Sequence, residues 1–479
     1  MRNISLFISL RRITQIFFLF LSIGFIRKIL YFDPLLSLSL IFSTRNLAKS
    51  FFVSLFILIF TIVLGRFFCG WFCPLGTLNQ AVSYISKKLF FKRRKELYHP
   101  AQKIKYFITI VLLLLAIFRI NLAGLFSPVV IFYRGFYLIG RALFSLFIFL
   151  NKYLNIFSID RIFYWLECNI ADFSPQSTRL ISVVSLGFIM ILAFNLFTTR
   201  FWCRFLCPLG GFLGVISRKS ILHILGKGNC TGCLRCIEFC QGTCNPHLKE
   251  KWVKQECLFC MHCLNCPEKN LQLGTRISKA HLQRLNYQKV DFSRREFLYT
   301  LGGSVLFYPL LKFGFKRSIS LKVIRPPGAI EENDFLNQCI RCQACIKHCP
   351  TQFLQPLLFA RGISSLFTPY GNGRIGYCKY TCHLCGIVCP TGALKNLTLS
   401  QKQKFKIGTA FIDKKRCLVY EKGINCLACY RHCPLQDKAI ISVNIGRGLS
   451  GPEIVPESCI GCALCENICP AEAIKTKAI

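Results

Sequence analysis

Acidic side chains are scarce in this 479-residue sequence, which has 21 Asp and Glu against 61 Lys and Arg and a formal charge of +40. It also lacks a nucleophilic triad, and it has no G-x-G-x-x-G motif or P-loop between a strand and a helix. Disorder is excluded because 53% of the residues are hydrophobic and 14% are aromatic. The length exceeds that of one ordinary domain, so we expect several.

The positive charge does not by itself predict a nucleic-acid partner. Basic residues lie mostly beside apolar runs, as the positive-inside rule places them in membrane proteins. The 30 cysteines are too many and too widely spread for a small disulfide scaffold, and their spacing predicts metal ligation. Deprotonated, ligated thiols remove part of the positive charge. We therefore expect no binding to nucleic acid.

The first 225 residues are predicted to form an α-helical membrane bundle. Four uncharged apolar runs are candidate spans: 13–26, 50–65, 106–118 and 180–199. The shorter runs can cross a bilayer if flanking cations such as Arg66 and Lys105 extend to the interface. Arg27 and Lys28 follow the first run, where a cleavable signal peptide would have small residues. We expect this run to be retained as a span.

Basic residues also set the expected orientation, with the N-terminus and the segments after the second and fourth runs in the cytoplasm. Residues 120–178 are apolar but carry several charges, among them Asp160, Glu167 and Asp172. We expect interfacial or re-entrant helices there, on the periplasmic side. This gives four spans, and an additional pair of spans would preserve the same topology.

A twelve-residue motif occurs twice in this part of the chain. Gly65-Arg-Phe-Phe-Cys69-Gly-Trp-Phe-Cys73-Pro-Leu-Gly76 returns as Thr199-Arg-Phe-Trp-Cys203-Arg-Phe-Leu-Cys207-Pro-Leu-Gly210. Two copies at equivalent ends of apolar runs suggest a pseudo-two-fold arrangement that brings the four cysteines together. Cys69, Cys73, Cys203 and Cys207 are therefore a candidate redox or metal site. The alternative is a packing motif at a helix end, because a free cysteine is a good small core residue.

The C-terminal region, residues 321–479, contains the clearest ligand pattern. Bacterial ferredoxins bind 4Fe-4S clusters with C-x₂-C-x₂-C-x₃-C-P, in which the fourth cysteine serves the other cluster of a pair. Two groups match fully: Cys339, Cys342, Cys345 and Cys349; and Cys459, Cys462, Cys465 and Cys469. Two are variants with a wider first gap: Cys378, Cys382, Cys385 and Cys389; and Cys417, Cys426, Cys429 and Cys433. Four clusters are predicted, and the sequence leaves their pairing open.

Residues 226–290 are predicted to form a cytoplasmic module with two more clusters. Its candidate ligands are Cys230, Cys233, Cys236, Cys240, Cys244, Cys257, Cys260, Cys263 and Cys266. We expect Cys266 to complete the first cluster and either Cys240 or Cys244 to complete the second. The total is then about six 4Fe-4S clusters, in small α+β bacterial-ferredoxin-like modules stabilised by metal more than by apolar cores.

Residues 291–320 join the two Cys-rich regions. Ser293-Arg-Arg-Glu-Phe-Leu298 precedes an apolar run and is similar to a twin-arginine export signal. This segment is expected to supply an outward span, which would place the module of residues 321–479 in the periplasm.

Taken together, the motifs resemble two known families fused in one chain. Residues 10–270 resemble a NapH-type, polyferredoxin-like membrane quinol dehydrogenase, through Arg11-Arg12, the repeated motif and the ferredoxin module. Residues 291–479 resemble a NapG/MauM-type ferredoxin, through Ser293-Arg-Arg-Glu-Phe, Arg325-Pro-Pro-Gly-Ala329 and Cys389-Pro-Thr-Gly-Ala-Leu394. The resemblance implies electron flow from membrane quinol through 4Fe-4S clusters to a periplasmic acceptor such as a nitrate reductase system.

The resulting expectation is a multi-pass protein of the inner (cytoplasmic) membrane. Its expected partners are lipid, quinol and a periplasmic redox protein such as a cytochrome or terminal reductase. Quinol oxidation releases two protons, which a carboxylate such as Asp33 could accept, although a solvated loop charge is the simpler interpretation. The alternative function is an accessory protein that reduces a metal or a partner while a respiratory enzyme is assembled or maintained.

Overall fold

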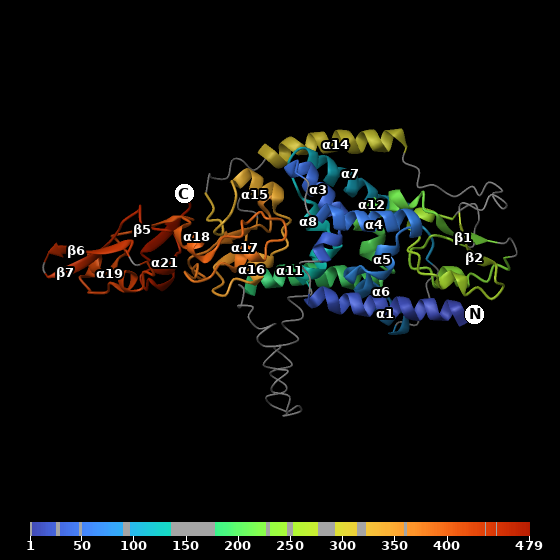
Figure 1. The fold of residues 1–479 in the computed structure, drawn as a ribbon, viewed down its shortest axis with the longest axis horizontal. Coiled ribbons are helices and arrows are strands. Elements are labelled where there is room, and N and C mark those ends of the chain that lie inside the picture. The colour runs from blue at the N-terminus through green and yellow to red at the C-terminus, as the bar shows by residue number, and fades with distance from the viewer. Residues whose placement is uncertain are drawn as a thin grey trace, which may run out of the picture. The chain divides into compact units, whose positions relative to one another are not determined.

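The computed structural model describes twelve stretches of the chain. They are 2–24, 29–46, 50–89, 96–135, 178–226, 230–246, 252–275, 293–313, 322–358, 362–435, 437–446 and 448–479. The chain divides into two compact units, one made of residues 1–137 and 184–308 and the other of 138–183 and 309–479 (Figure 1). Most of residues 120–178, with Asp160, Glu167, Cys168 and Asp172, lie outside the described residues.

The first unit is mainly helical. Its longer helices are α1 (Arg2–Gly24), α3 (Pro34–Thr44), α4 (Ser50–Leu64), α6 (Pro74–Leu89), α7 (Ile104–Ile117) and α12 (Pro208–Ser217), together with most of α11 (Thr178–Ala193) and most of α14 (Arg294–Phe313). Helices α3 and α12 each pack against both α4 and α7, and α1 packs against α6. The core of this unit therefore lies between helices that are distant in sequence.

The described part of each of the four apolar runs is mainly helical. Within the described residues, two helical segments are long and apolar enough to cross a membrane, Ser5–Ser22 and Pro100–Ile117. Four shorter apolar segments accompany them: Pro34–Thr44, Phe51–Leu64, Leu186–Leu196 and Pro208–Ser217. Helix α14, where the outward span was expected, belongs to neither group. It begins with reciprocal hydrogen bonds between Ser293 and Glu296, the capping box encoded in the Ser-Arg-Arg-Glu sequence.

The Cys-rich stretch of the first unit contains short elements only. They are β1 (Leu222–Gly226), α13 (Arg235–Glu238), the 3₁₀ turns η6 (Lys254–Glu256) and η7 (His262–Leu264), and β2 (Leu271–Thr275). Strands β1 and β2 pair antiparallel, with Leu222 opposite Thr275. Turn η6 packs against α12, which joins this module to the helices.

A buried ion-pair network fixes this junction and corrects the expectation for Arg66 and Lys105. Neither cation extends to an interface: both are fully buried and both pair with Glu256 on η6. Arg66 Nη1 lies 2.8 Å from Glu256 Oε2, and the Tyr106 hydroxyl donates to Glu256 Oε1 at 2.8 Å. The two cations outweigh the effect of burial and lower the pKa of Glu256.

Asp33 is likewise not a solvated loop charge. Its side chain is fully buried at the start of α3, where Oδ1 accepts hydrogen bonds from the amides of Leu35 and Leu36. Oδ2 accepts a hydrogen bond from the Ser127 hydroxyl at 2.6 Å. Asp33 is therefore the N-cap of α3, a role that stabilises the helix and also ties it to residue 127.

The described part of the second unit consists of short helices and two-stranded sheets. The helices are α15 (Glu332–Gln338), α16 (Ala344–Lys347), α17 (Leu384–Ile387), α18 (Leu399–Lys404), α19 (Leu418–Lys422), α20 (Ala428–Arg431) and α21 (Leu464–Ile468). The strands are β3 (Leu354–Pro356), β4 (Pro369–Gly371), β5 (Thr409–Ile412), β6 (Ile440–Gly446), β7 (Leu449–Ile454) and β8 (Ile474–Lys477). They pair antiparallel as β3–β4, β5–β8 and β6–β7.

Glu256→Gln is expected to destabilise the first unit, because it leaves the buried Arg66 and Lys105 without a counter-charge. Breaking a buried ion pair from one side costs about 3–5 kcal/mol. Thermal unfolding of the detergent-solubilised chain, followed by circular dichroism, should show a lower midpoint. The matched control is Glu268→Gln at an exposed carboxylate. Equal midpoints for the two variants would show that the network does not hold the junction.

A pH effect is expected at Asp33. Burial raises the pKa of its carboxyl from 3.8 to about 6, so stability present at low pH is lost as pH rises through that value. Between pH 5 and 8 the wild-type free energy of unfolding should fall by roughly 1.4 kcal/mol from this group. Asp33→Asn should remove that fall, whereas Asp413→Asn, at an exposed position, should keep it. Parallel pH profiles for wild type and Asp33→Asn would contradict this.

Candidate functional site

The cysteine loops share one backbone conformation. In five of them the residue directly after the second loop cysteine has positive φ, between 49° and 63°. These residues are Leu234, Met261, Gln343, Leu427 and Ala463. A one-turn helix that carries the third cysteine follows each of them. The sixth loop, with Cys378 and Cys382, differs from the others. The residue after its second cysteine is His383, which has φ −135°. The spacing of the cysteines therefore builds the same three-thiol loop repeatedly.

The fourth cysteine of each group crosses to its neighbour. Burial and the nearby thiols of Cys342, Cys339 and Cys389 raise the pKa of Cys345 well above its usual value. Burial and the thiols of Cys378, Cys382 and Cys349 raise the pKa of Cys385 to about 12. Cys349, Cys378, Cys382 and Cys385 line one pocket and form set 4. We assign the remaining four, Cys339, Cys342, Cys345 and Cys389, to set 3, so that the two sets exchange their last cysteines.

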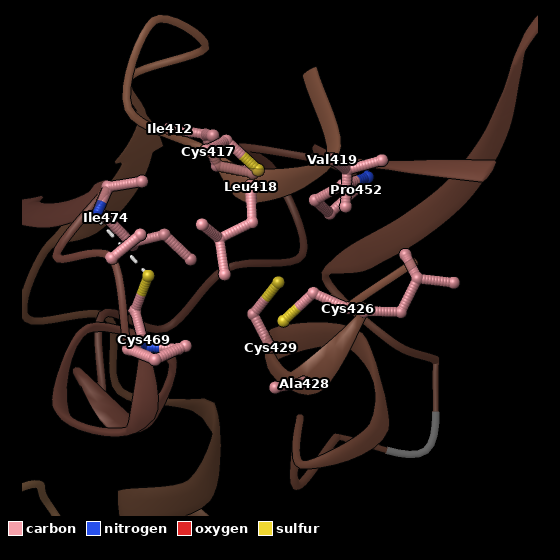
Figure 2. Close-up of a pocket in the computed structure, with 14 residues that line it drawn as sticks. Ile412, Cys417, Leu418, Val419, Cys426, Ala428, Cys429, Pro452, Cys469 and Ile474 are labelled. Carbon is pink, nitrogen blue, oxygen red and sulfur yellow. Dashed lines mark hydrogen bonds between the residues drawn. The ribbon is translucent and has the colours of Figure 1, made fainter. Parts of the chain in front are cut away.

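The other two groups of the second unit exchange cysteines in the same way. Set 5 (Cys417, Cys426, Cys429 and Cys469) surrounds a pocket whose other walls include Leu418, Val419 and Ile474 (Figure 2). The Ala473 amide donates to Cys469 Sγ at 3.3 Å. Set 6 consists of Cys433, Cys459, Cys462 and Cys465, which line a second pocket together. The pairing is thus sequential, set 3 with set 4 and set 5 with set 6.

The two pairs meet through sets 4 and 6. The amide of Cys378, a member of set 4, donates to the carbonyl of Cys462, a member of set 6, at 2.8 Å. Asn467, in the helix of set 6, also donates to the Gly373 carbonyl at 3.2 Å. The spatial order is therefore set 3, set 4, set 6, set 5, and α17, α21 and α19 follow one another in that order (Figure 1). Chain order and spatial order differ for the last two sets.

The first unit holds two further sets. Burial, followed by the neighbouring thiols of Cys230, Cys240, Cys233 and Cys266, raises the pKa of Cys236 to about 11. We assign Cys230, Cys233, Cys236 and Cys266 to set 1, with Cys266 as the fourth cysteine that the sequence predicts. Set 2 consists of Cys257, Cys260 and Cys263 with Cys240, which lies close enough to raise the pKa of both Cys260 and Cys263. Here too the two sets exchange their fourth cysteines.

Cys244 lies beside set 2 as a neighbour of two of its ligands. Its Sγ is 3.4 Å from Cys240 Sγ, and a hydrogen bond from Cys244 lowers the pKa of Cys240 to about 7. A hydrogen bond with the Cys244 thiol also lowers the pKa of Cys257. The same hydrogen bonds raise the pKa of Cys244 itself. The Cys244 amide also donates to Cys240 Sγ at 3.4 Å, a contact that stabilises a thiolate at Cys240.

The two copies of the repeated motif bring Cys69, Cys73, Cys203 and Cys207 together, and we name these four the interhelical quartet. Burial first, and then the thiols of Cys203, Cys69 and Cys73, raises the pKa of Cys207 well above its usual value. Cys73 and Cys207 immediately precede α6 and α12, and their sulfurs accept from the amides of Gly76 at 3.4 Å and Gly210 at 3.3 Å. All four cysteines are buried and free.

Comparison with known proteins identifies the chemistry of these cysteines. A family model described as "4Fe-4S binding domain" matches residues 50–94 and 181–227, the two segments that contain the interhelical quartet. Another model with this description matches residues 452–475, which contain Cys459, Cys462, Cys465 and Cys469 of sets 5 and 6. The ferredoxin-type protein NapG of Escherichia coli is 36% identical over 157 residues, which cover 31% of this chain and 67% of that protein. The chain belongs to the NapG/MauM family of ferredoxin-type proteins.

Two methylamine utilization ferredoxin-type MauM proteins give similar matches. That of Methylorubrum extorquens is 37% identical over 153 residues, 31% of this chain and 68% of its own length. That of Methylobacillus flagellatus is 38% identical over 152 residues, 31% of this chain and 64% of its own length. No solved structure matches the chain.

These matches confirm a 4Fe-4S electron-transfer protein of ferredoxin type, as the cysteine spacing predicted. The NapH-type interpretation of the first half stays a prediction. The buried groups Arg11, Arg200 and Glu256 were missed, although Arg66 and Arg200 occupy the same position of the repeated motif. That equivalence could have singled out Arg66 and Arg200, whereas no comparable signal marked Arg11 or Glu256.

Cys240→Ser and Cys244→Ser are expected to differ. Serine at position 240 removes a set 2 ligand, so the purified chain should lose about four iron atoms and four acid-labile sulfides. Serine at position 244 should keep the iron content and change only the reduction potential of that cluster, because it alters a hydrogen bond. Iron and sulfide analysis with potentiometric titration measures both. Iron loss in Cys244→Ser alone would reverse the assignment.

Proposed function

We propose that this chain is a quinol dehydrogenase of the cytoplasmic membrane that transfers electrons from membrane quinol to a periplasmic acceptor. The observation that carries the proposal is the spatial order of sets 3, 4, 6 and 5, joined by the Cys378–Cys462 backbone hydrogen bond. An accessory protein that reduces one metal or one partner needs no line of four sites. A nitrate-reductase-type system is the proposed acceptor.

The cysteines of sets 1 to 6 are the proposed ligands of six 4Fe-4S clusters, which supply one-electron transfer at potentials set by their surroundings. The chain's own residues shape those surroundings. Leu418, Val419 and Ile474 shield set 5 from water, and the Ala473 amide stabilises the Cys469 thiolate. Such hydrogen bonds and low polarity tune reduction potentials.

Exposed apolar side chains of the first unit support a membrane location. Large side chains on α1, α4 and around α11 are more than half exposed: Leu6, Ile13, Phe17, Phe20, Phe52, Phe56, Leu186 and Phe197. Soluble monomers rarely expose so many apolar side chains on neighbouring helices, whereas helices in lipid do. The two long apolar segments, Ser5–Ser22 and Pro100–Ile117, also support a membrane location.

The proposed topology follows from the charges. Basic residues such as Lys87, Lys88, Arg218 and Lys219 support a cytoplasmic location for sets 1 and 2. The twin-arginine-like start of α14 supports a periplasmic location for the second unit, with sets 3 to 6. Substrate oxidation and delivery to the acceptor then occur at separate parts of the chain.

Electron paramagnetic resonance of isolated membranes tests the function. Addition of a reduced menaquinone or ubiquinone analogue under anaerobic conditions should produce reduced-cluster signals that are absent from membranes lacking the chain. Signals that develop only with dithionite would overturn the quinol dehydrogenase assignment. They would favour an accessory protein that reduces a metal or a partner during assembly or maintenance of a respiratory enzyme.

A further inference from the structure

We propose that buried charges divide the four cluster sites of the second unit into a high-potential pair, sets 3 and 4, and a low-potential pair, sets 6 and 5. Electrons then reside on the first pair and reach the second by an uphill transfer from set 4 to set 6. The proposal rests on the charged side chains around the cysteines and does not depend on quinol as the electron donor.

Buried charge is distributed unevenly along the line of cysteine sets. In the described part of the second unit the buried charged side chains are Arg325, Arg341, Lys347, Lys402 and Glu466. Among these five, the four cations lie at sets 3 and 4, and the carboxylate lies at set 6. Arg325 contributes little net charge, because Glu332 accepts from its guanidinium with both carboxylate oxygens, at 2.8 and 2.6 Å. The other cations still leave an excess of buried positive charge beside sets 3 and 4.

Lys402 is built into the loop of set 4. It belongs to α18, and its ammonium donates to the carbonyls of Lys379 and Tyr380 at 2.7 and 3.2 Å. Both carbonyls lie between Cys378 and Cys382, in the gap that is one residue wider than in sets 3 and 6. Burial raises the pKa of Cys378 to about 11, and the Lys402 ammonium opposes that rise. The wider gap of this loop therefore accommodates a buried cation next to a ligand.

Arg341 and Lys347 are built into set 3. Arg341 lies between the first two cysteines of the set and donates to the carbonyls of Cys339 at 3.2 Å and Ser364 at 2.7 Å. Lys347 lies in α16, the one-turn helix that carries the third cysteine. Arg341 opposes the rise that burial causes in the pKa of Cys339. Lys347 has the same effect at Cys342.

Glu466 gives set 6 the opposite charge. It directly follows the third cysteine of the set in α21, and its Oε2 accepts from the Thr476 amide at 2.8 Å. The backbone at Gly373 approaches so closely that an added Cβ would lie 2.3 Å from this oxygen. The cation partner of Glu466 is Arg374 at 3.7 Å, which also contacts Glu472 at 3.3 Å. One cation shared between two carboxylates leaves the surroundings of set 6 negative.

These charges act on the reduction equilibria of the clusters. A 4Fe-4S cluster on four thiolates carries about −2, and reduction adds one further negative charge. A buried cation therefore raises the reduction potential and a buried carboxylate lowers it, since solvent screens buried charges weakly. None of the five buried charges belongs to a loop of set 5, which lacks the stabilisation that sets 3 and 4 receive.

The consequence is a store of electrons beside an uphill transfer. Each transfer from set 4 to set 6 moves one electron, oxidises the first site and reduces the second, and transfers no proton. At equilibrium sets 3 and 4 hold two electrons, one each, before set 6 is substantially reduced. Lys402 and Glu466, at adjacent sets, define the height of this step.

A redox titration of the anaerobically purified full chain in detergent, followed by electron paramagnetic resonance, tests the division. Lys402→Met should make reduction of one cluster about tenfold less favourable, a shift of about 59 mV to lower potential for one electron. Glu466→Gln should shift a different cluster by a similar factor to higher potential. Each variant thereby assigns its own signal. In the wild type, the signal moved by Lys402→Met should titrate at higher potential than the one moved by Glu466→Gln, and equal or reversed potentials would overturn the proposal.

Matched variants separate charge from packing. Lys402→Arg keeps the positive charge and should titrate near the wild-type potential. Lys404→Met, at an exposed lysine of the same helix, and Glu472→Gln, at an exposed carboxylate, should shift no signal. A Lys402→Met protein with every signal at its wild-type potential would contradict the proposal.

A second variant covers the case in which Lys402→Met does not retain its iron. Lys347→Met removes a buried cation of set 3 and should lower the potential of one cluster that, in the wild type, titrates above the signal moved by Glu466→Gln. A wild-type position at or below that signal would overturn the division. Because these tests read potentials, their outcome is independent of quinol oxidation.

Discussion

A short loop can surround a cubane with three thiolates, but the fourth thiolate has to come from elsewhere in the chain. This constraint organises both units. Cys266 and Cys240 connect sets 1 and 2, and Cys389 and Cys349 connect sets 3 and 4. Each exchange ties two loops together, so small sheets and one-turn helices suffice around them. Cluster binding and folding are therefore the same process in these modules.

Buried charge has a comparable role in the helical unit. Glu256 belongs to the cysteine module, whereas Arg66 and Lys105 belong to helical segments far away in sequence. Their pairing joins the module to the helices. Removal of these two cations from water costs several kcal/mol each, and Glu256 compensates part of that cost as the carboxylate between them.

The ligand pattern was readable from the sequence because cubane geometry dictates local spacing. Cys339, Cys342 and Cys345 had to form one loop whatever the rest of the chain does, and the structure contains that loop. The helical segments were also predictable, since long apolar runs form helices in lipid and in protein cores alike. The burial of Arg66 and Lys105 was not predictable, because a cation next to an apolar run can extend to a membrane interface or pair with a buried carboxylate. Glu256, almost two hundred residues away, decides between these options.

The sequence by itself therefore determined the cofactor class, the three-thiol loops and the repeated motif, because each depends on residues within about a dozen positions. Only the tertiary structure decided how the loops pair and that set 6 lies between sets 4 and 5. It also decided that Asp33 is buried, where it accepts a hydrogen bond from Ser127. Each of these depends on contacts between distant segments. Local spacing does not encode such contacts, because chain closure over long loops is specified by packing and buried charge.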